Sequence, residues 1–271
     1  MLKIIKTDLF RLFRTKAFYV YPIFLVFVEI MSMCFSVVRM TDGDSEVIVD
    51  FAARSVKCGP VDFAGCLGDG LLLLFLGIAM AIFYTNESRH GFLKNAAGCA
   101  VDKRFMPVSK MITGVITLFI YIAEYIVIRT VFMLIEALAS GAEIEYTGIP
   151  AGDEGRFVIY VLLCLFVHIT CIALLVLMHE LTHSRALMLL SVFIFSATLA
   201  DKLIVGAFNL LKSKFTWLGG ININRYMMML NIENGYLSKT YYPLTLFIVC
   251  MIYFGLGAIL SATVANRKDV R

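Results

Sequence analysis

Apolar residues gather in six long stretches of the chain, and shorter polar segments separate them. An α-helix of about 20 residues spans the roughly 30 Å of hydrocarbon in a bilayer, and each stretch is at least that long. The pattern therefore predicts an all-α membrane protein with six transmembrane helices. The predicted spans are Ala17–Val38, Phe63–Tyr84, Ile112–Leu138, Phe157–Met178, Ala186–Phe208 and Pro243–Thr263.

Residues 1–16 have a different periodicity from the spans. Leu2, Ile5, Leu9 and Leu12 fall on one helical face, while basic side chains such as Arg11 lie opposite. This spacing predicts an amphipathic helix that lies in the membrane interface and leads into the first span. A second interpretation is that the basic residues act only as a topology signal.

Composition supports one membrane domain over residues 1–271. The chain is 60% apolar and only 16% charged, whereas soluble domains average nearly half apolar and about a quarter charged. The six spans leave loops but no room for a separate soluble catalytic domain. Most of the seven cysteines lie within apolar stretches, where cysteine behaves as a small hydrophobic residue. A disulfide between Cys58 and Cys66 stays open at this point.

The distribution of lysine and arginine predicts how the chain is oriented. With the N-terminus inside, segments 1–16, 85–111, 179–185 and 264–271 carry fourteen basic residues, and the longer outside loops carry eight. Cytoplasmic segments of membrane proteins are enriched in these residues. We therefore expect a multi-pass protein of the cell membrane with both termini in the cytoplasm, a cytoplasmic loop at 85–111 and a cytoplasmic tail at 264–271.

Three motifs in the first 110 residues lie next to the predicted spans. One motif precedes the first span, a second follows the second span, and a third opens the third span. Their residues are Lys6, Asp8, Leu9, Arg11, Leu12, Arg14, Thr15, Lys16 and Phe18, then Glu87, Gly91, Lys94 and Asn95, then Arg104, Phe105, Ser109 and Lys110. Together these motifs resemble the membrane subunit of an ABC transporter of the type-2 exporter class.

The resemblance implies an interfacial elbow helix, six spans and a coupling helix that docks on a separate ATPase subunit. It also implies a second permease subunit, identical or related, and a substrate such as a peptide, an antibiotic or a lipid. The chain lacks the phosphate-binding G-x-x-x-x-G-K-[ST] motif, so we expect it not to hydrolyse ATP itself. We expect it not to be an enzyme, and we expect no cofactor and no nucleic-acid partner. From composition alone, the same loop also fits a solvated connector. The coupling residues would be Glu87, Arg89, Gly91, Phe92, Lys94 and Asn95.

Charged and polar residues inside the predicted spans are the second group of candidates. Such residues are costly in lipid, so they mark either a translocation pathway or pairs that fix helix packing. Both interpretations stay open. The residues concerned are Glu29, Glu124, Arg129, His168 and Asp201.

The segment His179–His183 matches the H-E-x-x-H pattern of zinc proteases. On a helix the two histidines stand one turn apart and can share a zinc ion, with Glu180 as the base. No third ligand follows at the usual spacing, and the motif falls in a short polar turn between two spans. A zinc-dependent membrane protease is therefore the alternative function. A membrane scaffold or sensor without transport activity is the third hypothesis.

Overall fold

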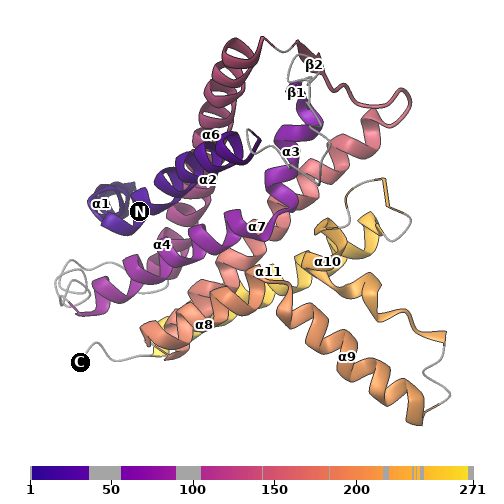
Figure 1. Cartoon of the computed structure of the whole chain (residues 1–271). Helices are drawn as coiled ribbons and strands as arrows, with labels where there is room; N and C mark the ends of the chain where they lie inside the picture. Colours follow the sequence, from indigo (N-terminus) through magenta and orange to yellow (C-terminus); the bar gives the residue numbers. More distant parts are fainter. Residues whose placement is uncertain are drawn as a thin grey trace, which may run out of the picture.

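The structure is a computed structural model of the chain. It describes residues 2–36, 56–89, 105–141, 143–182, 184–215, 220–233, 235, 237–238 and 241–267. These residues form a bundle that is almost entirely helical (Figure 1). The helices are α1 (Leu2–Phe13), η1 (Lys16–Tyr19), α2 (Val20–Ser36), α3 (Pro60–Gly68), α4 (Gly70–Arg89), α6 (Phe105–Ser140), α7 (Glu154–Thr182), α8 (Arg185–Ser196), α9 (Leu199–Lys214), η4 (Ile223–Tyr226), α10 (Met228–Glu233) and α11 (Pro243–Arg267).

Four helical segments are each long and apolar enough to cross a bilayer without a break. They are Lys16–Met33, Phe105–Ala139, Glu154–Thr182 and Pro243–Arg267. Two bent helix pairs, α3 with α4 and α8 with α9, raise the number of candidate spans in the described residues to six if each pair is one span. The chain is a multi-pass integral membrane protein.

The two bent pairs differ from the straight second and fifth spans that the sequence predicts. The axis turns by 54° between α3 and α4, and by 69° between α8 and α9. Asp69 lies at the first break and accepts a hydrogen bond from the backbone N–H of Leu71 in the first turn of α4. The second break lies at Ala197 and Thr198, before the polar residues that interrupt the apolar stretch.

Helix α7 is the centre of the bundle and packs against α11, α6, α8 and α4 (Figure 1). Its neighbour α4 packs closely against α8 because two positions of α4 that contact α8 are glycines without a side chain. A Cβ on Gly70 would lie 1.9 Å from the carbonyl oxygen of Ser196, and one on Gly77 would lie 2.5 Å from Val192. The close approach of these two helices therefore depends on glycine.

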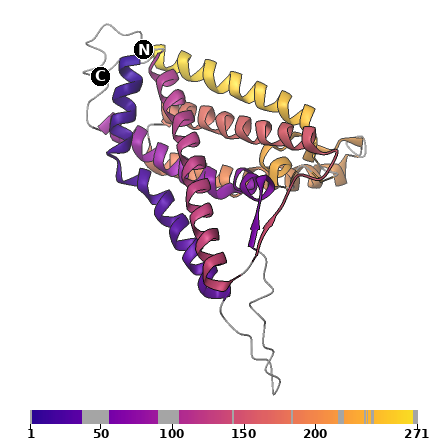
Figure 2. The same cartoon turned by 90° about the horizontal axis from the view of Figure 1, so that it is seen from above.

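A short parallel strand pair joins the connection between α2 and α3 to the connection between α6 and α7. Strand β1 (Val56–Cys58) pairs with β2 (Ile144–Tyr146), which follows the end of α6. Cys58 and Cys66 are both free thiols, so this region contains no disulfide between them. In both views α1 and the last turns of α11 lie on the same side of the molecule, away from the strands (Figures 1 and 2).

Candidate functional site

Buried and partly buried polar side chains gather where α4 ends and where α6 and α8 begin. Segment 90–104, which connects α4 to α6, starts and ends at this place. We call these side chains the loop-end cluster. Its members come from α1, α4, α6, α7 and α8, and they are Asp8, Thr85, Asn86, Ser109, Lys110, Glu180 and Arg185.

An ion pair between Lys110 and Glu180 joins α6 to α7. The Lys110 Nζ lies 3.0 Å from the Glu180 Oε1, and the two side chains are 2% and 8% exposed. The hydroxyl of Tyr84 on α4 donates to the backbone carbonyl of Lys110 at 3.0 Å. A charge buried to this degree is tolerated only with a partner, so the pair fixes the relative position of the two helices.

A second contact joins α6 to the N-terminal helix. The Ser109 hydroxyl donates to the Asp8 carboxylate at 2.6 Å, and Asp8 is only 2% exposed. The Arg11 guanidinium lies 3.9 Å from the same carboxylate and 5.6 Å from the ring centroid of Phe83 on α4. Leu12 is buried as its place on the apolar face predicts. Helix α1 is therefore bound to the bundle by polar contacts as well as by its apolar face.

The third contact joins the end of α4 to the start of α8. The Arg185 Nε donates to the Thr85 hydroxyl at 3.1 Å, and its Nη2 donates to the Asn86 side-chain oxygen. Ser184 accepts the backbone N–H of Leu187 and so caps α8 at its first turn. Both helices that flank segment 90–104 are thus tied to other parts of the bundle, α4 to α8 and α6 to α1 and α7.

The predicted coupling residues fall just beyond this cluster. Glu87 and Arg89 form the last turn of α4. Gly91, Phe92, Lys94 and Asn95 lie outside the described residues. Their role in binding an ATPase stays a prediction.

His179 and Glu180 of the H-E-x-x-H segment lie in the last turn of α7, at the cluster. His179 is fully buried, and its ring centroid lies 5.5 Å from that of Tyr84. Glu180 is held by the Lys110 ammonium, which would have to be displaced before the carboxylate could act as a base on metal-bound water. The described residues contain no group of three His, Cys, Asp or Glu side chains placed to hold a metal ion. His183 lies outside them.

The remaining predicted intramembrane residues do not form one site. Arg129 on α6 and Glu29 on α2 make an ion pair at 2.6 Å, which joins these two helices. His168 is fully buried, and its Nδ1 donates to the carbonyl of Cys164 one turn earlier in α7. The Asp201 carboxylate accepts hydrogen bonds from the backbone N–H groups of Met229 and Leu230 and so caps α10.

Glu124 and His168 differ from the other three residues. The Glu124 Oε2 and the His168 Nε2 are buried without a hydrogen-bond partner among the residues that the structure describes. Glu29, Arg129 and Asp201 thus make contacts between different helices, whereas these two atoms make none. A pathway role for the group stays a prediction.

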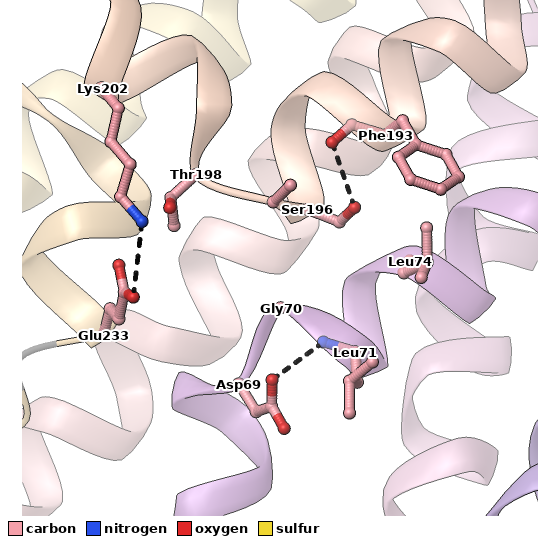
Figure 3. Close-up of a pocket in the computed structure, with 10 residues that line it drawn as sticks. Asp69, Gly70, Leu71, Leu74, Phe193, Ser196, Thr198, Lys202 and Glu233 are labelled. Atoms are coloured by element: carbon pink, nitrogen blue, oxygen red, sulfur yellow. Dashed lines mark hydrogen bonds and ion pairs between the residues drawn. The ribbon is translucent and has the colours of Figure 1, made fainter.

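A cavity of about 310 Å³, lined by both apolar and polar residues, lies where the two helix breaks meet (Figure 3). We call it the break-point cavity. The start of α4, the end of α8, the start of α9 and the end of α10 all contribute to its wall. An ion pair between Lys202 and Glu233 lies at its edge, with 3.8 Å between Nζ and Oε1. Asp69 also lines the cavity, next to Gly70 (Figure 3).

Thr198 is the least expected residue of the break-point cavity. Its φ angle of 52° puts a β-branched residue in the left-handed region, which such residues rarely adopt. Its side chain is buried, and its hydroxyl has no hydrogen-bond partner among the described residues. The sequence gives no signal for this conformation, since an isolated threonine within an apolar stretch usually continues a helix.

Comparison with known proteins does not assign the chain to a family. No protein-family model matches the chain, and no curated protein sequence matches it. The structure and the composition therefore support a multi-span helical membrane protein, and its function has to be proposed from the residues.

Proposed function

We propose that the chain is the permease subunit of an ATP-binding-cassette exporter and works with a separate ATPase subunit. Two permease subunits, identical or related, would enclose the pathway, and ATP binding and hydrolysis by the partner would move them between two states. The substrate would be a peptide, an antibiotic or a lipid. The chain itself would bind no nucleotide.

The observation that supports this proposal is the loop-end cluster. A coupling segment has to transmit force to the spans without first unfolding the helices on either side. Arg185 restrains the end of α4, and Lys110 and Ser109 restrain the start of α6. Displacement of segment 90–104 would therefore move α1, α7 and α8 with it. A solvated connector would need no such side-chain contacts at both of its ends.

The test is purification of the tagged chain from the membrane of its own cell. We expect it to bring down a protein that contains the G-x-x-x-x-G-K-[ST] motif and hydrolyses ATP. The substitution Glu87→Arg reverses a charge next to segment 90–104 and should remove this protein from the purified sample. Thermal unfolding of the variant should match that of the wild type, because Glu87 lies at the end of α4.

The matched control is Glu143→Arg, which makes the same change of charge in the connection between α6 and β2. Glu143 is exposed, and it lies at the opposite end of α6 from segment 90–104. It should leave the ATPase bound. Retention of the ATPase by Glu87→Arg, or its equal loss in both variants, would count against the proposed coupling segment. Absence of any ATPase from the wild-type sample would contradict the proposal as a whole.

A further inference from the structure

A groove that meets the loop-end cluster at Asn86 runs between the N-terminal segment and α4. Its volume is about 800 Å³. One wall comes from α1, η1 and the start of α2, and the other comes from the second half of α4. Three basic residues line it, together with apolar side chains. The residues used below are Arg11, Arg14, Lys16, Val20, Ile78 and Ile82.

The polarity of the groove changes along its length. Asn86, Ile82 and Ile78 follow one another at intervals of four residues, so they lie on one face of α4. Eight residues of α-helix rise about 12 Å. The face is therefore polar next to the end of α4 and apolar over the next two turns. Val20 continues the apolar part on the opposite wall.

The three basic residues of the groove are only partly balanced by acidic groups. Arg11 has Asp8 at 3.9 Å. Arg14 lies over the ring of Phe10, with 4.4 Å from its Cζ to the ring centroid. A phenyl ring accepts no conventional hydrogen bond, so this contact does not replace a phosphate as partner for the guanidinium N–H groups. Within the part of the chain that the structure describes, neither Arg14 nor Lys16 makes an ion pair with an acidic side chain.

We propose that this groove binds one anionic phospholipid. The phosphate lies against Arg14 and Lys16, and an acyl chain follows Ile82 and Ile78 toward the centre of the bilayer. Basic pockets beside transmembrane helices attract anionic lipid headgroups, and the apolar walls exclude a free phosphate as the preferred occupant. This inference goes beyond the proposed transport function and does not depend on it.

The test uses the purified full-length chain in detergent with phosphatidylglycerol or phosphatidylcholine of equal acyl length. Native mass spectrometry measures the fraction of the protein that carries one lipid at each lipid concentration. We expect phosphatidylglycerol to bind more tightly than phosphatidylcholine. The double variant Arg14→Gln/Lys16→Gln should weaken phosphatidylglycerol binding by about 30-fold, because each cation near a headgroup is worth roughly a factor of five.

The matched control is Lys212→Gln/Lys214→Gln on α9, which lowers the net charge by the same amount and lies outside the groove. It should bind phosphatidylglycerol like the wild type. A second variant, Ile78→Trp, fills the apolar part and leaves every charge in place, and it should weaken binding as well. Inorganic phosphate at the same concentration should not displace the lipid.

Three outcomes would overturn the proposal. These are equal binding of the two lipids, an equal loss of binding in the groove variant and the α9 control, and displacement of the lipid by inorganic phosphate. Each variant is compared at a temperature at which its melting curve shows a folded protein. The Ile78→Trp result stands by itself if the double variant fails to fold.

Discussion

At the scale of single residues, the buried Lys110–Glu180 pair makes the clearest energetic prediction. The substitution Lys110→Met leaves the Glu180 carboxylate buried without its cation, and removal of one partner from a buried pair costs about 3–5 kcal/mol. The double variant Lys110→Met/Glu180→Met removes both charges and should be more stable than Lys110→Met alone. A thiol-reactive dye measures unfolding, since Cys164, Cys171 and Cys250 are buried in the folded bundle.

The exposed pair at the break-point cavity supplies the control for that experiment. Lys202 and Glu233 are about half exposed, and exposed ion pairs contribute at most about 1 kcal/mol. Lys202→Met should therefore shift the melting temperature far less than Lys110→Met. Equal shifts in melting temperature for the two single variants would contradict the burial of the Lys110–Glu180 pair. A double variant no more stable than Lys110→Met would contradict it as well.

Thr198 leads to a prediction of the opposite sign. Glycine adopts a φ of 52° without steric cost, whereas a left-handed conformation costs a β-branched residue about 1–3 kcal/mol. Thr198→Gly should therefore raise the melting temperature. Thr198→Ala removes the same hydroxyl but keeps a Cβ, so it should gain less. A lower stability of the glycine variant than of the alanine variant would contradict this backbone conformation.

At the scale of helices, the contact between α4 and α8 depends on the absence of a side chain at Gly70. A methyl group there would overlap the carbonyl of Ser196, which is backbone and cannot turn away. Gly70→Ala should therefore separate the two helices and lower the melting temperature in the thiol-dye measurement. Gly255→Ala on α11 is the control, since a Cβ at that position meets nothing within 4 Å. Equal effects of the two substitutions would rule out the close contact.

The elements also show which features could be predicted from the sequence. The apolar character of a span is set by residues that are adjacent in the sequence, so the hydropathy pattern predicts the helices α2, α6, α7 and α11 well. The break at Asp69 has a local signal in the charge, whereas the break at Thr198 has none. Contacts such as Lys110–Glu180 and Ser109–Asp8 join residues 70 and 101 positions apart. A single sequence contains no periodicity that would reveal them.

At the scale of the whole molecule, these contacts link the two ends of segment 90–104 to the two helix breaks. The helices that flank segment 90–104 are restrained at one end of the bundle, and the two helix breaks lie near the other end of α4. Motion imposed at the first place would reach the second along α4 and α8, which are in close contact over their length. A permease that opens and closes needs this kind of mechanical continuity between its coupling segment and its spans.

The last prediction concerns the side of the membrane on which segment 90–104 lies. Native cysteines test it, because Cys99 falls within this segment and Cys58 falls in β1 at the other end of α6. Cys58 is a free and partly exposed thiol. The excess of lysine and arginine around Cys99 predicts that it faces the cytoplasm. A membrane-impermeant maleimide should therefore label Cys58 in intact cells and label Cys99 only after the membrane is opened. The variants Cys58→Ser and Cys99→Ser identify which thiol reacts, and labelling of Cys99 in intact cells would place the segment out of reach of any cytoplasmic ATPase.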